Sequence, residues 1–514
     1  MRFIQTFSLT LLLGLSLSVQ AQLPQPASTV QGLLQGTVEQ GLAIFRGVPY
    51  AAAPVGANRW RAPQPLPQWA GLRMAEEFGP RCVQGNFAPG AEQPLTSEDC
   101  LYLNVWTPAT HAQAELPVLV WIHGGGFFTG AGSAANYDGA ALARKGAVVV
   151  TLNYRLGSFG FFAHPALSAE DPHGSSGNYA MLDMLAALHW VQDNIAAFGG
   201  DPAKVTLMGE SAGAMAVGNL LASPLSEGLF QRAILQSGSW MGWGFSAALP
   251  QAAAREAEGL EQAATFGADS LEDLRAASAA EIAAHFPANG LPNVDGYLLP
   301  EDPSLLLDQG RQQNIPVLVG SNRDEGVFFG PGIQTAVELQ DWAEQRFGPR
   351  AAAFLEIYPI DDDGTANASY LRAYSDELAW QLRQLGRYQA ALGSAAWVYY
   401  FTRVPPGQEA NGSTHVAELP YMFAHSAANP QWLDSDRGLS EQMTTYWINF
   451  ANSGNPNGSG LQWPAFHDNS PGSVLILDET VAAETSIQPS AEALEFFDAA
   501  WQDHLQRLRD TPMR

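Results

Sequence analysis

Seven short runs of apolar residues divide the chain, and each has the length of one buried β-strand. Between them, apolar residues recur with the period of an α-helix, as in 178–197, where Met181, Leu185 and Leu188 share one face. Strands that are apolar throughout need cover on both faces, which intervening helices supply. The pattern predicts an α/β fold with a large, mainly parallel central sheet and helices on both faces. Its predicted strands are 101–106, 118–122, 147–153, 205–208, 233–235, 316–319 and 396–401.

Two further regions have helical patterns but no convincing strands. One is rich in Ala and Glu and lies near 246–313, and the other lies near 337–387. We interpret both as helical insertions over one end of the sheet rather than as independent domains. Residues 22–514 are therefore expected to form a single domain.

The first 21 residues have the pattern of a secretory signal peptide. Arg2 precedes an apolar stretch from Leu9 to Val19, and the small residue Ala21 provides a cleavage site. An uncleaved membrane anchor is the alternative, but the stretch is short for a span and is interrupted by serines. We expect cleavage near Ala21, a mature chain without a membrane anchor, and export to the periplasm or the medium.

Charge and motif spacing narrow the range of partners. The formal net charge is −26 at pH 7, so the chain repels phosphate backbones and anionic lipid surfaces, and binding to nucleic acid is disfavoured. The glycine run at 124–130 does not fit the dinucleotide-binding spacing, and no phosphate-binding loop or zinc-type ligand spacing occurs. The sequence therefore predicts a small-molecule substrate, with no cofactor and no metal. It gives no indication of an oligomeric state.

The only two cysteines, Cys82 and Cys100, lie in one Gly/Pro-rich segment. In an oxidising compartment, a pair that closes a loop of this length forms a disulfide more often than a metal or redox site. We predict that the two are bridged, which stabilises the fold by about 3 kcal/mol in the loop-entropy description.

A candidate nucleophile lies in residues 205–217. A β-branched and apolar run leads into Gly209-Glu210-Ser211-Ala212-Gly213, and small helix-forming residues follow. This is the strand–turn–helix pattern of a nucleophile elbow, in which a strained turn lifts a serine hydroxyl above the end of a central strand. A Cβ at either glycine would collide with the neighbouring strand or helix. The five-residue pattern also arises by chance, but the flanking strand and helix favour Ser211 as a nucleophile.

A second glycine-rich turn follows a buried strand. Strand 118–122 leads into His123 and three consecutive glycines. Backbone N–H groups unobstructed by side chains are what the oxyanion of a tetrahedral intermediate requires. A plain flexible turn is the alternative. We predict an oxyanion hole formed by the N–H groups of Gly125, Gly126 and Ala212.

A serine nucleophile also needs a base and an acid that orients the base. After such an elbow the acid follows a later strand and the histidine comes last. Asp324 and Glu325 both follow strand 316–319, and spacing alone does not choose between them. His415 lies in the loop after strand 396–401, where the base is required, whereas His425 falls in an apparent helix and is interpreted as structural.

Several segments together resemble the type-B carboxylesterase family, which includes bacterial carboxylesterases, p-nitrobenzyl esterases and cholinesterases. They are SEDCLYLNVWTP (97–108), WIHGGGF (121–127), NIAAFGGDPAKVTLMGESAGA (194–214), SNRDEG (321–326) and HVAELPYMF (415–423). The resemblance implies an α/β-hydrolase fold, Glu325 as the acid and His415 as the base. It also implies that Cys82 and Cys100 are bridged, and that Glu210 and Glu418 are acidic groups near the histidine.

The resemblance points to a set of aromatic residues around the substrate. Cholinesterases stack the quaternary ammonium of their substrate on a tryptophan in the disulfide loop, but here that loop offers only Phe87, so choline ester specificity is not expected. Ordinary core packing is the alternative for aromatic residues near the site loops. The predicted pocket residues are Phe127, Trp240, Trp243, Phe328 and Phe329.

These features predict an exported serine esterase that forms an acyl-enzyme on Ser211. A lipase or an amidase with the same triad is the first alternative, and it would differ in its lid and pocket. A non-catalytic binding protein on the same scaffold is the second, and the presence of all three triad residues argues against it.

Overall fold

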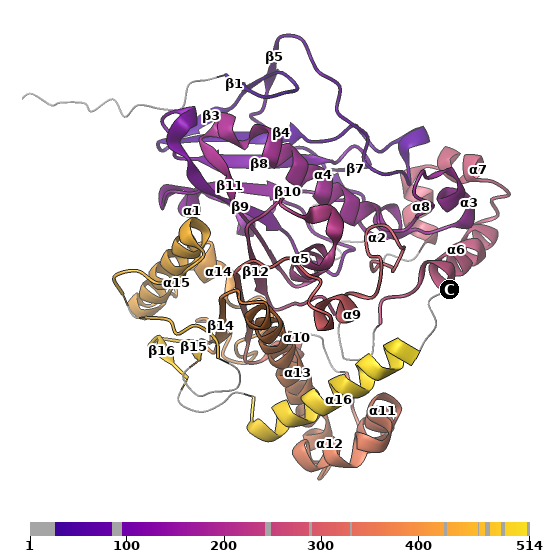
Figure 1. Cartoon of the computed structure of the whole chain (residues 1–514), viewed down its shortest axis with the longest axis vertical. Coiled ribbons are helices and arrows are strands. Elements are labelled where there is room, and N and C mark those ends of the chain that lie inside the picture. Colours follow the sequence, from indigo (N-terminus) through magenta and orange to yellow (C-terminus); the bar gives the residue numbers. More distant parts are fainter. Residues whose placement is uncertain are drawn as a thin grey trace, which may run out of the picture.

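The computed structural model, shown in Figure 1, describes most of the chain after the predicted signal peptide. The predicted signal, residues 1–21, and Phe87 lie outside the described residues. The described residues are 26–84, 95–241, 248–286, 290–328, 332–425, 429–460, 462–467, 473–484 and 489–510.

A twisted sheet, eleven-stranded over the described residues, runs through the centre of the molecule. Every neighbouring pair from β15 to β10 is parallel, and antiparallel pairs occur only towards the two edges. The predicted α/β fold with a mainly parallel sheet is therefore confirmed. In spatial order the strands are β16 (Ala482–Ala483), β15 (Val474–Leu477), β14 (Ala396–Phe401), β13 (Val317–Asn322), β12 (Arg232–Gln236), β11 (Gly200–Glu210), β9 (Leu116–Ile122), β10 (Val148–Leu152), β8 (Tyr102–Thr107), β4 (Leu42–Pro49) and β3 (Thr37–Glu39).

Continuous apolar runs form these strands because both faces of the sheet are covered. On β9, Val118 and Val120 belong to one hydrophobic cluster, whereas Leu119 and Trp121 belong to another on the opposite face. Successive side chains of a strand point to opposite faces, so a strand buried on both sides has no polar alternation.

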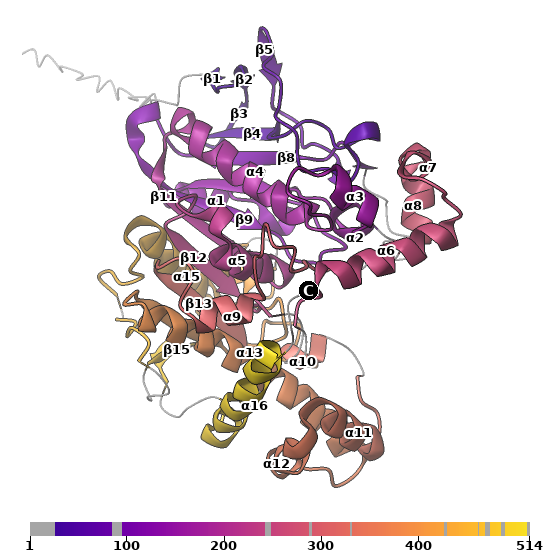
Figure 2. The ribbon, with the colours of Figure 1, turned by 45° about the vertical axis from the view of Figure 1, so that its right-hand side comes forward.

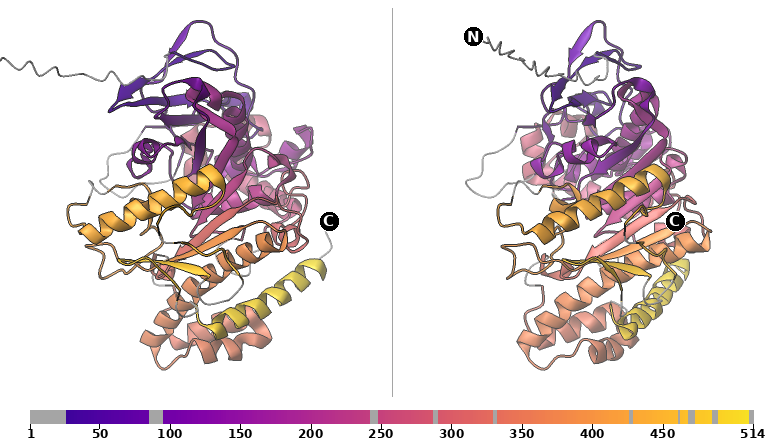
Figure 3. Two further views of the ribbon diagram at one scale, coloured as in Figure 1. Left: turned by 60° about the vertical axis from the view of Figure 1, so that its left-hand side comes forward. Right: turned by 90° about the vertical axis from the view of Figure 1, so that its left-hand side faces the viewer.

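Helices cover the two faces. One face packs against α4 (Tyr179–Asn194), α5 (Ala212–Ala222) and α13 (Asp363–Ala391), and the other against α1 (Ala140–Arg144) and α15 (Asp434–Ser453). Figure 3 shows the orange α15 lying across its face of the sheet. Among the helices that the structure describes, none is long and apolar enough to cross a membrane. The other α-helices are α2 (Gly157–Phe161), α3 (Pro165–Glu170), α6 (Ala252–Phe266), α7 (Leu271–Ala276), α8 (Ala279–His285), α9 (Pro303–Asp308), α10 (Glu325–Phe328), α11 (Ala336–Phe347), α12 (Ala351–Ile357), α14 (Leu419–Met422) and α16 (Ala491–Asp510).

The two regions interpreted as insertions differ from one another. The first contains α6 to α9, and α6 to α8 project to one side of the sheet in Figure 2. The second contains α11 and α12, but its longest helix is α13, which buries Leu378, Leu382 and Leu385 in the core beside β13 and β14. Much of the second region is therefore a helix that covers one face of the sheet.

The parallel strands bring four chain positions to the same edge of the sheet. β9, β11, β13 and β14 end at Ile122, Glu210, Asn322 and Phe401. In open parallel sheets, ligands bind beyond the carboxyl ends of the strands. The loops that follow these four strands carry the glycine turn, Ser211, Glu325 and His415.

Candidate active site

Ser211 stands at the junction of a strand and a helix. β11 ends at Glu210, α5 begins at Ala212, and Ser211 between them has φ 59° and ψ −127°. A non-glycine residue at such angles is strained and persists only where its surroundings enforce it. The predicted strand, turn and helix of the nucleophile elbow are confirmed.

The first turn of α5 packs directly on the end of β9. A Cβ added at Gly213 would lie 2.1 Å from the carbonyl oxygen of Ile122 and 2.9 Å from that of His123. No side chain fits between the two backbones, so a glycine is needed here for close approach.

The glycine turn after β9 adjoins the serine. A Cβ at Gly124 would lie 2.9 Å from the Cβ of Ser211, and Gly125 and Gly126 have φ values of 101° and 63°. The N–H of Ala212 is the first of α5, a position that has no acceptor within its own helix. The structure thus brings the predicted oxyanion donors to the neighbourhood of Ser211.

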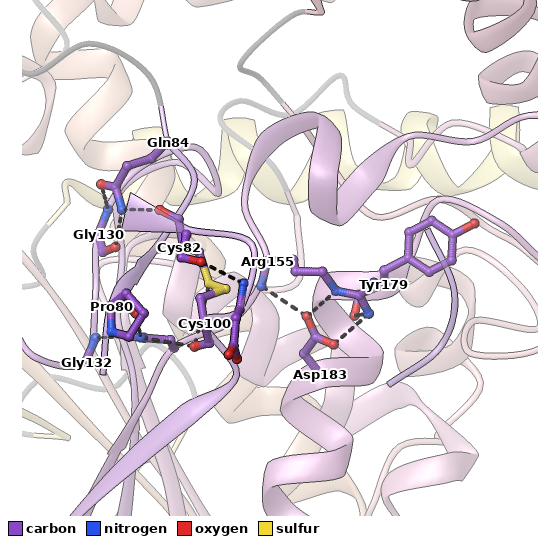
Figure 4. Close-up of a disulfide and its surroundings, with 12 residues drawn as sticks. Pro80, Cys82, Gln84, Cys100, Gly130, Gly132, Arg155, Tyr179 and Asp183 are labelled. Carbon is purple, nitrogen blue, oxygen red and sulfur yellow. Dashed lines mark hydrogen bonds and ion pairs between the residues drawn. A yellow bond between two sulfur atoms is a disulfide. The ribbon is translucent and has the colours of Figure 1, made fainter. Parts of the chain in front are cut away.

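Gln84 fixes the far end of this turn and was not predicted. Its Oε1 accepts hydrogen bonds from the Gly130 N–H at 3.0 Å and the Thr129 hydroxyl at 2.9 Å, and its Nε2 donates to the Gly130 carbonyl at 2.9 Å. Figure 4 shows Gln84 beside the bridge between Cys82 and Cys100, which confirms the predicted disulfide. A single glutamine near a cysteine has no sequence pattern that would reveal this role.

Glu325 and His415 form a buried pair. The Nδ1 of His415 lies 2.6 Å from the Oε2 of Glu325, and the Oε1 of Glu325 accepts a hydrogen bond from the Asn322 N–H at 2.7 Å. A carboxylate can only accept hydrogen bonds, so Nδ1 carries the proton and Nε2 can act as a base. Asp324, the alternative that spacing left open, points to Arg323 and Ser413 instead.

The other ring nitrogen of His415 faces the end of β11. Nε2 lies 3.2 Å from the Oε1 of Glu210, the residue directly before Ser211. Burial and the Glu325 carboxylate raise the pKa of Glu210 well above its ordinary value. A raised pKa favours the neutral carboxyl, which places less negative charge beside the glycine turn.

Glu418 belongs to a buried polar chain beneath the histidine. It accepts hydrogen bonds from Asn322 Nδ2 at 2.6 Å and Gln236 Nε2 at 3.1 Å, and the Oε1 of Gln236 accepts one from Trp447 Nε1 at 3.1 Å. Burial and the carboxylate of Glu210 raise the pKa of Glu418 to about 8, against the opposing effect of the Asn322 amide. The positions implied for Glu210 and Glu418 near the histidine agree with this arrangement, whereas Asn322 and Gln236 were not predicted.

Two of the predicted pocket residues pack within the hydrophobic core. Phe127 is fully buried, with its ring between Tyr154 and Phe161, because the turn directs it inward. Trp240 is also buried: its ring packs against Tyr388 and Trp501, and its Nε1 donates to the hydroxyl of Ser304. Tyr388 lies near the end of α13, whereas Gly326 beside the acid packs on Leu371 near its beginning. The packing therefore directs the Trp240 ring away from the acid.

Phe328 is the predicted pocket residue that the structure does bring to the site. Its side chain is 54% exposed, and its ring centre lies 5.0 Å from that of His415. Phe128 was not predicted, but it is also exposed and adjoins Gly126. Trp243 and Phe329 lie outside the described residues.

The described residues contain no group of three or more His, Cys, Asp or Glu side chains that could hold a metal ion. The chemistry available at this edge of the sheet is that of a hydroxyl, an imidazole, carboxyl groups and backbone N–H donors. That set can transfer an acyl group through a covalent intermediate on the hydroxyl.

Comparison with known proteins gives consistent matches over nearly the whole chain. The model of the carboxylesterase family matches residues 19–497. Fumonisin B1 esterase of Sphingopyxis macrogoltabida is 41% identical over 488 residues, covering 89% of this chain and 88% of that protein. Para-nitrobenzyl esterase of Bacillus subtilis (strain 168) is 38% identical, covering 90% and 96%. A solved structure of PNB esterase superposes with a TM-score of 0.80 at 34% identity, covering 93% of this chain and 100% of that one.

Proposed function

Because the chain belongs to the carboxylesterase family and is a carboxylic-ester hydrolase, we propose that Ser211, His415 and Glu325 are its catalytic triad. The buried pairing of Glu325 with Nδ1 of His415, whose Nε2 faces the end of β11 directly before Ser211, supports this most directly. Gly125, Gly126 and Ala212 provide the oxyanion donors.

Each group has one task in the reaction. Nε2 of His415 takes the proton of the Ser211 hydroxyl while Oγ forms a bond to the ester carbonyl carbon, and the carbonyl oxygen becomes the oxyanion. Collapse of this intermediate breaks the bond to the alcohol, which leaves with the proton from Nε2. Water then attacks the acyl-enzyme with His415 again as base, and the acid leaves from Ser211. Glu325 orients the ring and stabilises its charged form throughout.

Replacement of the serine tests the assignment. Ser211→Ala should lower kcat for p-nitrophenyl butyrate by at least about 10⁴-fold and abolish covalent labelling by an organophosphate, since the acyl-enzyme cannot form. Ser453→Ala, which removes an exposed hydroxyl at the end of α15, is the matched control. Persistent turnover or labelling in Ser211→Ala would mean that another residue is the nucleophile.

The names of the relatives suggest substrates to try first. We propose that the chain accepts p-nitrobenzyl esters and the esters of fumonisin B1, because the proteins named for these activities are 38% and 41% identical to it. A panel of these esters, short p-nitrophenyl esters, emulsified tributyrin and an anilide separates an esterase from a lipase or an amidase. Faster turnover of emulsified tributyrin or of the anilide than of any soluble ester would reject the esterase assignment.

We also propose that the protein is exported, with cleavage near Ala21. The pattern of residues 1–21 and the bridge between Cys82 and Cys100 support an oxidising compartment. The N-terminal sequence of the protein recovered from the periplasm or the medium should begin near Gln22. Recovery of an intact leader from a cytoplasmic fraction would contradict export.

A further inference from the structure

The catalytic histidine is carried by a segment that has no regular structure. β14 ends at Phe401 and α14 begins at Leu419, and residues 402–418 between them are all described without a helix or strand. Such a segment loses much conformational entropy when it is fixed in one place. The 2.6 Å contact between His415 and Glu325 therefore depends on specific interactions that hold the segment.

Asp324 makes a reciprocal pair of hydrogen bonds with this segment. Its backbone N–H donates to the carbonyl of Ser413 at 2.9 Å, and the N–H of Ser413 donates to its Oδ2 at 2.7 Å. Asp324 directly precedes the acid Glu325, and Ser413 lies two residues before the base His415. The pair thus joins the two loops immediately beside the acid and the base.

The chain at Gly412 is shaped to let the carboxylate approach. Gly412 has φ 79°, and a Cβ there would lie 2.3 Å from the Oδ2 of Asp324. Only glycine adopts this conformation readily while leaving room for the oxygen. Both the backbone and the side chain of Asp324 are therefore fitted to residues 412 and 413.

Arg323 holds the Asp324 carboxylate in position. Its Nη2 and Nε lie 2.8 Å and 3.0 Å from Oδ2, the same oxygen that accepts the Ser413 N–H. Asn322 holds the next two residues, since its Nδ2 donates to the carbonyls of Thr414 at 2.7 Å and His415 at 3.1 Å. Residues 413 to 415 are thus bound in succession by Asp324 and by Asn322, the last residue of β13.

We propose that Asp324 is a positioning residue: its hydrogen bonds with Ser413 hold the histidine segment so that the His415 ring meets Glu325 and faces Ser211. This inference rests on the proposed triad. It gives Asp324 a role in catalysis without contact with the substrate or the reacting atoms. The two adjacent carboxylates therefore have different roles: Glu325 orients the imidazole, and Asp324 orients the backbone that carries it.

Asp324→Ala and Asp324→Asn, assayed with p-nitrophenyl butyrate, test the role. The alanine variant should lower kcat by about 10- to 100-fold with KM within about threefold of the parent, because displacement of a catalytic group by about 1 Å costs this much in rate. The asparagine variant should stay within about threefold of the parent, since its amide oxygen still accepts the Ser413 N–H. Asp503→Ala, which removes a half-buried carboxylate on α16 that pairs with Arg350, is the matched control and should match the parent.

A second variant and a spectroscopic measurement guard against a folding defect. Gly412→Ala should reproduce the kcat loss, and the double variant with Asp324→Ala should be less impaired than the product of the two single losses, because the added methyl no longer meets a carboxylate. The low-field proton resonance of a histidine N–H bonded to a carboxylate should broaden or vanish in Asp324→Ala and persist in Asp324→Asn. Thermal unfolding midpoints establish that each variant is folded when assayed.

The outcomes separate this inference from the proposed triad. If Ser211→Ala and His415→Ala remain active, the triad itself is wrong. If both are inactive while a folded Asp324→Ala has the kcat of the parent, the triad stands and the positioning role is overturned. Equal loss in Asp324→Ala and Asp324→Asn, or simple multiplication of the losses in the double variant, would also overturn it.

Discussion

Ser211 stands between a strand and a helix, whereas His415 stands on a segment that has neither. The turn around Ser211 is fixed by contact between backbones, most closely at Gly213 against Ile122. The histidine segment is held by hydrogen bonds that Asn322 donates to the carbonyls of Thr414 and His415, and by the reciprocal pair between Asp324 and Ser413. Around the proposed nucleophile Ser211, the nucleophile side, position depends on glycines that leave room for backbone contact. Around the proposed acid Glu325 and base His415, the acid–base side, it depends on polar side chains that hydrogen-bond to the histidine segment.

The difference has a thermodynamic reason. Close backbone packing gains its energy from many weak contacts and tolerates no added atom. A buried polar network depends on each partner, because an unsatisfied donor or acceptor costs about 1–3 kcal/mol. The nucleophile side should therefore fail when volume is added, and the acid–base side when a hydrogen-bonding partner is removed or its protonation changes.

Among the substitutions that test this comparison, Gly213→Ala should have the largest effect. The methyl group would lie 2.1 Å from the Ile122 carbonyl, and relief of this clash must move either α5 or the glycine turn. We expect kcat/KM to fall by at least about 10³-fold and the free energy of unfolding to fall by about 3 kcal/mol, as overpacking in a rigid site does. Denaturant unfolding and an esterase assay measure the two losses.

Gly438→Ala is the control for this variant. Gly438 lies within α15, and a Cβ there would meet nothing within 4 Å. Alanine is the better helix former by about 1 kcal/mol, so this variant should be as active as the parent and no less stable. Normal activity in Gly213→Ala would show that the backbone contact does not position the nucleophile.

The structure around Ser211 could be predicted from the sequence, because the same strands and glycines that make it rigid form a local sequence pattern. Apolar runs encode buried strands, and the glycines at 209 and 213 record where backbones must approach. These features are local, so a single stretch of chain contains both the pattern and its cause. The mainly parallel sheet and the strand, turn and helix around Ser211 therefore agree with the sequence-based prediction.

The acid–base side depends on contacts between residues that are distant in the sequence, so the partners of its side chains could not be predicted from local patterns. Spacing left Asp324 and Glu325 equivalent, since only the fold shows that one faces His415 and the other Ser413. Trp240 was assigned to the pocket on the family resemblance, and nothing in the sequence indicated that its ring packs against Trp501, far along the chain. Which neighbours a side chain meets is set by tertiary packing, which no local pattern encodes.

The next effect tests the buried carboxyls of the acid–base side. Burial and Glu210 raise the pKa of Glu418 to about 8 from an ordinary value of 4.5. Between these values the folded state holds a proton that the unfolded state releases, so stability should fall as pH rises through this window, by up to about 1.4 kcal/mol per pH unit. Glu418→Gln cannot titrate, so the plot of unfolding free energy against pH should be flatter by about this slope.

Urea unfolding at pH 5, 6, 7 and 8 measures the slope for parent and variant. Glu441→Gln, which replaces a carboxylate that is 70% exposed on α15, is the control and should keep the parental slope. Parallel plots for parent and Glu418→Gln would show that Glu418 holds no such proton. If the parent instead gained stability relative to Glu418→Gln as the pH rises, the charged form of Glu418 would be the one that the Asn322 and Gln236 amides stabilise.

The smallest effect is expected from Phe328, an exposed residue beside His415. Phe328 is more than half exposed, with its ring 5.0 Å from that of His415, so Phe328→Ala should leave stability within about 0.5 kcal/mol. Loss of an apolar surface beside the acyl or alcohol group should change the ratio of kcat/KM for butyrate and octanoate esters by about three- to tenfold. Phe78→Ala, which removes a phenylalanine that is 43% exposed, should leave this ratio unchanged. If Phe328→Ala left this ratio unchanged but lowered kcat strongly for every ester, Phe328 would belong to the groups that hold the histidine. The acid–base side would then extend to the surface.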